Sequence, residues 1–229
     1  MGLNELMAGL DWSPLWISVK TGLATTFVSF FLGILLAWKM EKRKTKLCAL
    51  IDSILTLPLV LPPTVAGFLL LLLFSRRRPV GIFLFDNFHI RIVQTWAGCV
   101  IAAFVIAFPL MYKNARAAFA QIDRNLVFAG KTLGISNRRI FWNIVIPVSG
   151  PGIMAGTVLT FARSMGEYGA TSMLAGNIAG KTGTISQEIA LVIQDGNYSE
   201  AGIWVLIVLV LSFFLIMLMN LIGNPKWKR

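Results

Sequence analysis

The apolar stretches of this chain contain few ionisable side chains, and Arg163 and Glu167 are two of them. The two residues are four positions apart, which places them one helical turn from each other and lets them form an ion pair. Ionisable residues within a bilayer usually pair or face a cavity, and they mark functional sites. Two interpretations stay open: an ion pair that braces a bundle of helices, or a charged element of a path or gate for an ion.

Three prolines, Pro58, Pro62 and Pro63, lie within six residues in the middle of another apolar stretch. Each proline removes a backbone donor and clashes with the preceding turn, so this segment must break or kink strongly. Inside a membrane, the carbonyl groups freed by a break are satisfied only by other protein or by a water-filled cavity. The segment is therefore either a kinked helix packed against its neighbours or a broken helix that lines a transport path.

The composition indicates that the elements positioning these residues are membrane helices. The 229-residue chain is 56% hydrophobic and only 14% charged, with a mean hydropathy of +0.74, whereas soluble domains carry about 25% charged residues. The apolar residues form long blocks, so lipid is the solvent for most of the chain. We expect an all-α, polytopic membrane bundle in a single domain, residues 1–229. The blocks predict five spans, at about 15–38, 50–74, 96–112, 152–165 and 201–222.

The distribution of lysine and arginine between the blocks predicts the orientation of the chain. Segments 39–46, 113–139 and 226–229 hold fourteen of these residues, whereas the segments on the opposite side hold five. The N-terminus is therefore expected outside and the C-terminus in the cytoplasm. The run Arg76–Arg78 is an exception on the outer side, and a short apolar stretch after it is expected to form a helix at the membrane interface. The first residues lack a basic segment and a cleavage site, so no cleaved signal peptide is expected.

The longest polar stretch without a predicted span, about residues 123–143, is expected to form two short cytoplasmic helices that meet at Gly134. Glycine suits the left-handed turn that ends a helix. Ser136 or Asn137 can cap the helix that follows. The two arginines after Asn137 then give a basic, partly apolar surface on the cytoplasmic side.

The sequence FAGKTLGISNRRIFWNIVIPVSGPGI, residues 128–153, resembles the signature loop of ABC-importer permeases. The family pattern has Glu-Ala-Ala, then a glycine four residues after the second alanine, then an isoleucine and a proline. This chain departs from the pattern at Phe128, where the family usually has glutamate. In the family this loop forms coupling helices that dock on the ATPase subunit. The resemblance assigns the coupling role here to Phe128, Ala129, Gly130, Gly134, Arg138, Arg139, Ile144 and Pro147.

Two further segments, LPLVLPPTVAG and FARSMGEYGAT, resemble the corresponding parts of molybdate and sulfate permeases. The resemblance covers nearly the whole chain and implies the type I ABC-importer permease fold. It places Pro58, Pro62, Pro63, Arg163 and Glu167 in the translocation path or its gate. There Arg163 would attract a dianion and Glu167 would limit its trapping. Molybdate or tungstate is the expected cargo, with sulfate or thiosulfate as the alternative, because these segments separate the oxyanions poorly.

The resemblance also implies an assembly around this chain. The path would lie on the two-fold axis of a homodimer, surrounded by membrane lipid, in the cytoplasmic (inner) membrane of a prokaryote. Two ATP-binding cassette subunits would dock on the signature loops, and a periplasmic or lipid-anchored oxyanion-binding protein would dock outside. ATP and magnesium are expected on the ATPase subunits, because this chain has no GxxxxGK[ST] phosphate loop. The chain itself is expected to bind no cofactor.

Other function classes find less support in the residues. No Ser-His-Asp arrangement, paired carboxylates or metal-ligand cluster is visible, so no catalytic or metal residue is assigned and a membrane enzyme is not favoured. The net charge of +11 lies mainly between apolar blocks and no nucleic-acid motif is present, so no nucleic-acid partner is expected. Cys48 and Cys99 are expected to be reduced packing residues, and Asp52 and Lys113 to be interfacial anchors. A secondary transporter that needs no ATPase stays open.

Overall fold

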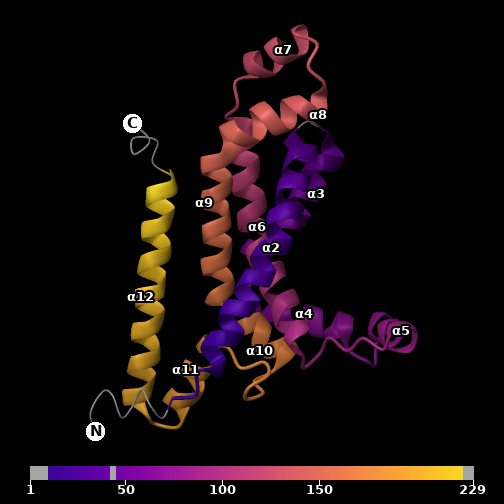
Figure 1. Ribbon diagram of the computed structural model, residues 1–229. Helices are drawn as coiled ribbons and strands as arrows, with labels where there is room; N and C mark the ends of the chain where they lie inside the picture. The colour runs from indigo at the N-terminus through magenta and orange to yellow at the C-terminus, as the bar shows by residue number, and fades with distance from the viewer. Residues whose placement is uncertain (1–9, 42–44, 224–229) are drawn as a thin grey trace.

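The computed structural model describes residues 10–41 and 45–223, and within these ranges the chain is all-α, without a strand (Figure 1). The expected fold class is therefore confirmed. The α-helices are α2 (Ser13–Glu41), α3 (Lys46–Thr56), α4 (Pro63–Phe74), α5 (Pro79–Phe88), α6 (Trp96–Ala120), α7 (Arg124–Thr132), α8 (Asn137–Ile140), α9 (Ile146–Met165), α10 (Gly169–Ala175), α11 (Ile185–Gln194) and α12 (Tyr198–Gly223).

Four helical segments of the described chain are long and apolar enough to cross a membrane: α2, α6, the segment Asn137–Met165 and the part Tyr198–Leu221 of α12. A fifth crossing is present if the pair formed by α3 with its 3₁₀ turn (Leu57–Leu59) and α4 counts as one span. The two members of this pair are bent by 111° at the proline segment. The chain therefore has the break or strong kink that three clustered prolines require.

Two helices extend beyond the apolar blocks from which they were predicted. α6 continues past Tyr112 to Ala120, because Ala115 and Phe119 extend its buried face into an apolar cluster. α9 begins at Ile146 rather than near Gly152, and Pro147 is its second residue. A π-helical turn, η2 (Phe141–Val145), joins α8 to α9 directly. The segment from α8 to the end of α9 is thus helical without interruption, and it is called the rod below; it turns at η2, since Figure 1 shows α8 crossing the end of the bundle and α9 running along it.

The centre of the bundle is formed by α2, α6 and α9, which pack on one another (Figure 1). Small residues let the backbones approach at these contacts. A Cβ atom on Gly33 of α2 would lie 2.8 Å from Met111, and one on Gly156 of α9 would lie 2.7 Å from Asn114. Such interfaces are typical of membrane helices, whose association relies on close packing rather than on the hydrophobic effect.

The two ends of the bundle carry different elements. Figure 1 shows α7 and α8 at one end and α5, α10 and α11 at the other, with α9 running between them. α12 packs on α9 and α11, yet only 11% of its apolar window is buried inside the chain. The short helix expected after Arg76–Arg78 is present as α5, and it exposes Phe83 and Phe88. Much of the apolar surface therefore faces away from this chain.

Candidate functional site

The signature loop turns at Gly134, as the sequence predicts. Gly134 has a φ of 73°, in the left-handed region. Its amide donates to the carbonyl of Lys131, and the amide of Ile135 donates to the carbonyl of Gly130. This pair of bonds is a Schellman motif, which satisfies the last carbonyl groups of α7. The side-chain oxygen of Ser136 then caps α8, so two short helices meet at a defined angle.

The surface of this loop is both apolar and basic. Phe128 is 58% exposed and Leu133 is 78% exposed. Ala129, Arg138 and Arg139 are exposed as well. Large exposed apolar side chains thus lie beside charged ones on this surface. The structure therefore leaves Phe128, Ala129 and the two arginines available to a partner.

The remaining residues of the signature pattern hold the loop together rather than form its surface. Gly130 is buried, and a Cβ atom added there would lie 3.2 Å from Ile140 and 3.3 Å from Ile144. The glycine thus lets α7 lie directly on α8 and η2. Pro147 stands in the first turn of α9, immediately after the π-helical turn. These positions fix how the loop continues into the rod.

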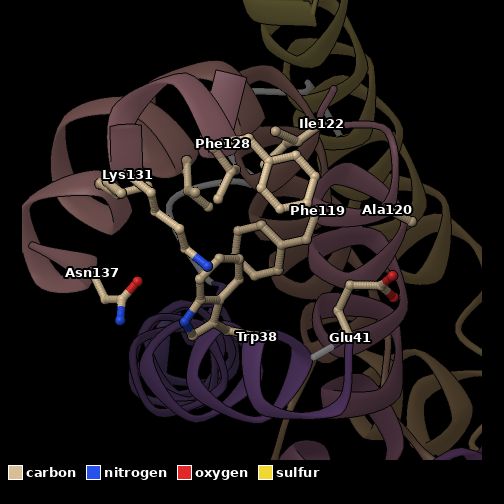
Figure 2. A pocket seen from close by; sticks show the side chains of 11 residues that line it. Trp38, Glu41, Phe119, Ala120, Ile122, Phe128, Lys131 and Asn137 are labelled. Carbon is tan, nitrogen blue, oxygen red and sulfur yellow. The ribbon is translucent and has the colours of Figure 1, made fainter. Parts of the chain in front are cut away.

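A cavity of about 510 Å³ lies beneath the loop, between α7 and the ends of α2 and α6. Its wall is largely aromatic, with Trp38, Phe119 and Phe128 among the lining residues. Figure 2 shows Lys131 reaching from α7 toward Trp38, with Glu41 at the side of the cavity. The loop nevertheless packs on the ends of α2 and α6, because Val127 and Ile140 belong to the same apolar cluster as Phe119, so the cavity lies beside these contacts.

A group of charged side chains ties α3 to α6 near the same end. Asp52 accepts hydrogen bonds from the Tyr112 hydroxyl at 2.8 Å and from Lys113 Nζ at 3.1 Å, and it also pairs with Arg116. Arg116 Nε lies 3.8 Å from a carboxylate oxygen of Glu41. Asp52 and Lys113, each expected to be an interfacial anchor, form one ion pair in the structure.

At the opposite end, Arg163 and Glu167 form the ion pair that their spacing predicts. Arg163 Nη1 lies 2.8 Å from Glu167 Oε2, and the side chains are 34% and 1% exposed. Glu167 lies just beyond the end of α9, in the short break before α10. Its other oxygen, Oε1, accepts a hydrogen bond from the amide of Ala170 in α10 at 2.8 Å. The carboxylate therefore bridges the break between the two helices.

The three prolines form the other helix break. Pro58 lies in the 3₁₀ turn after α3, Pro62 is the residue that precedes α4, and Pro63 begins α4. Pro62 and Pro63 stand at the start of α4, where proline is tolerated because no intrahelical donor is lost. The prolines therefore end one helix and start another in a new direction.

The tertiary structure brings the two breaks together, because α4 packs on α10. A Cβ atom on Gly67 of α4 would lie 2.6 Å from the Cα of Ala170. One on Gly169 of α10 would lie 3.0 Å from the backbone nitrogen of Thr64. The two half-helices therefore meet backbone to backbone. This contact places the proline segment and Glu167 in one substructure.

The residues that make this contact, Gly67, Gly169 and Ala170, were not among those expected from the sequence. No helical spacing marks them, because α9 ends at Met165 and α10 begins at Gly169. The signature loop and the two breaks lie at opposite ends of the bundle, and α9 connects them (Figure 1). Within the described residues, no group of three or more His, Cys, Asp or Glu side chains could hold a metal ion. The candidate site is therefore a structural connection, formed by α9, between the signature loop and the two helix breaks.

Comparisons with known proteins agree with this architecture. Residues 29–228 match the model of the family described as binding-protein-dependent transport system inner membrane component. The chain is 42% identical to the molybdenum transport system permease protein ModB of Escherichia coli (strain K12), over 84% of this chain and 83% of that protein. It is 30% identical to the sulfate transport system permease protein CysT of Salmonella typhimurium, over 97% and 85%. A chain from inward-facing MetNI methionine ABC transporter structures superposes with a TM-score of 0.70 at 15% identity, covering 98% of this chain and 100% of that one.

Proposed function

This chain belongs to the family of binding-protein-dependent transport system inner membrane components, and on that premise we propose that it is the permease subunit of an ATP-driven importer for molybdate. One observation carries the proposal. A continuous helical rod, Asn137–Met165, leads from an exposed basic loop to a pair of broken helices at the far end of the bundle. Such a rod can pass a movement of the loop to the helices that open or close a path.

The choice of molybdate rests on the relatives. Identity is 42% to a molybdenum permease and 30% to a sulfate permease, so the molybdate branch is favoured over the sulfate branch. Molybdate and tungstate are dianions of the same shape and nearly the same size. A transient path would separate them poorly, so tungstate is a second proposed cargo, and the separate binding protein sets the selectivity.

Two ATPase subunits are the proposed partners at the signature loop. Exposed Phe128 and Leu133, flanked by Arg138 and Arg139, offer them an apolar and basic docking surface. ATP and magnesium bind to those subunits in this scheme. Phe128 stands where the family pattern has glutamate, so the contact at this position is apolar rather than a salt bridge.

A second copy of this chain is the proposed partner within the membrane. The described chain has four or five possible spans, too few to enclose a path with ease. The exposed apolar surfaces of α4, α5 and α12 are available to that copy and to lipid. The oxyanion-binding protein docks at the end with α5, α10 and α11, which is the outer side if the basic signature loop is cytoplasmic. The N-terminus then lies outside and the C-terminus lies inside.

The mechanism requires an element with two states, and the loop with its rod supplies it. Closure of the ATPase pair on ATP draws two signature loops together and tilts the rods, which opens the path to the outside. Hydrolysis releases the loops and returns the path to the inside. The chain itself makes and breaks no covalent bond.

Reconstitution tests this function directly. The chain is co-purified with its ATPase and placed in liposomes with the binding protein, and uptake of molybdate, tungstate and sulfate is measured with and without ATP. We expect uptake that depends on ATP and on the binding protein, with molybdate and tungstate preferred over sulfate. Uptake by the chain alone, driven by an ion gradient, would instead identify a secondary transporter and refute the proposal.

A further inference from the structure

The helical rod ends at a joint formed by Arg163 and Glu167. The rod comprises 29 residues, and its straight part, α9, has 20 of them, which corresponds to roughly 30 Å at 1.5 Å per residue. Its first turn is capped by Ser136 in the signature loop, and Arg163 lies in its last turn. A displacement of the loop therefore reaches Arg163 through a continuous helix.

Glu167 connects the end of the rod to the next helix. Its carboxylate lies 2.8 Å from Arg163 through one oxygen and 2.8 Å from the amide of Ala170 through the other. The Glu167 side chain is 1% exposed. A carboxylate so enclosed does not face a water-filled path, so it is not placed to meet the cargo ion. Its two contacts lie on opposite sides of the helix break.

The helix beyond the joint is fixed to the proline-broken segment. Gly67 and Gly169 bring α4 and α10 into backbone contact. A bulky side chain at either place would force them apart. Since α10 is packed this closely on α4, the two half-helices move together.

The other end of α10 is also held. Gln187 of α11 donates from Nε2 to the side chain of Ser172 and to the carbonyl of Gly176, each at 3.1 Å. The backbone amide of Gln94, in the segment before α6, donates a hydrogen bond to the backbone carbonyl of Leu174 at 3.1 Å. α10 therefore belongs to a connected outer module that includes α4 and α11.

We propose that Glu167 is a positioning residue that makes this outer module follow the rod. The carboxylate holds Arg163 on one side of the break and the first turn of α10 on the other, so tilting α9 moves α10 and α4 with it. This inference rests on the proposed function, in which the rod is driven by the ATPase. It assigns Glu167 to transmission between motor and gate rather than to contact with the oxyanion.

The test separates transmission from simple bracing. Glu167→Gln keeps an oxygen for the Ala170 amide but removes the charge that Arg163 needs. Glu167→Asp keeps the charge but is too short to reach both partners. Glu188→Gln, on half-buried Glu188 of α11, is the matched control for an acid-to-amide change at the same end. Each variant is purified with its ATPase and reconstituted with the binding protein, and ATP hydrolysed per molybdate ion taken up is measured.

Both Glu167 variants are expected to hydrolyse ATP within about twofold of wild type while molybdate uptake falls at least fivefold, so that the ratio rises. The Glu188 variant is expected to keep the wild-type ratio. A brace would lower hydrolysis and uptake in proportion, because less folded complex is present, and an unchanged ratio overturns the proposal.

A second measurement needs no transport. Amide hydrogen exchange of the purified complex is compared between wild type and Glu167→Ala, in which both contacts of the carboxylate are lost. The backbone amides of residues 169–175 are expected to exchange at least tenfold faster in the variant. Unchanged exchange in that segment would refute the proposal that Glu167 connects α9 to α10. If wild type shows no ATP-dependent uptake, the proposed function fails, and the exchange experiment still decides whether Glu167 links the two helices.

Discussion

Replacing Gly134 by valine tests the backbone of the signature loop. A Cβ atom added at Gly134 would meet no atom within 4 Å, so the position has open space for a side chain. The cost arises from the backbone, because a φ of 73° is unfavourable for a residue with a Cβ atom. An L-residue in the left-handed region costs about 1–2 kcal/mol, and a β-branched residue fares worse than most.

This strain acts on a local equilibrium between the turned loop and alternatives. Each 1.4 kcal/mol changes an equilibrium by a factor of about ten. A strain of about 1–2 kcal/mol therefore reduces the population of the turned loop relative to its alternatives about 5- to 30-fold. The spans do not contact this position, so insertion and overall unfolding are expected to change little. The two hydrogen bonds of the Schellman motif, donated by the backbone amides of Gly134 and Ile135, are lost in the alternative conformations.

Asparagine at the same position is the matched control, because it tolerates the left-handed region better than other residues with a Cβ atom. Uptake of molybdate and ATP hydrolysis are measured for both variants in the reconstituted complex, together with the amount of protein in the membrane. We expect Gly134→Val to insert normally but to lose most of its coupled uptake, and Gly134→Asn to keep most of it. Normal uptake by the valine variant, or equal losses in both variants, would refute the reasoning from backbone strain.

Three further predictions concern stability. Gly67→Leu should lower the unfolding free energy by about 1–3 kcal/mol through overpacking, because its Cβ would lie 2.6 Å from the Ala170 backbone; an unchanged melting temperature in detergent would contradict the α4–α10 contact. Asp52→Asn should cost about 1 kcal/mol, since its ionic partners are 33–45% exposed; the difference should shrink in high salt, and a salt-independent difference would argue against an electrostatic origin. Burial, then neighbouring carboxylates, raise the pKa of Glu188 above its usual 4.5, so the folded state holds its proton to higher pH than the unfolded state. Stability should therefore fall as pH rises from about 4.5 through the folded pKa, and Glu188→Gln should flatten this part of the pH profile of melting temperature; identical profiles would contradict the shift.

The sequence by itself determined the features that depend on local chemistry. Apolar blocks of about 20 residues require a membrane, and three clustered prolines require a helix break wherever they occur. The turn at Gly134 and the cap at Ser136 follow from residues that are neighbours in the chain. The spacing of Arg163 and Glu167 predicted their ion pair for the same reason, and the pair forms although Glu167 lies just beyond the end of α9.

Only the tertiary structure decided how these local features meet. Gly67 and Ala170 are about a hundred residues apart, and their contact depends on how whole helices pack, which no short pattern encodes. Pairing of Asp52 with Lys113 and Arg116 likewise depends on where the tertiary structure places α3 relative to α6. Spacing also could not reveal that the second carboxylate oxygen of Glu167 reaches across a helix break to the backbone amide of Ala170. Local bonding sets the segments, whereas the close packing of distant backbones sets which segments move together.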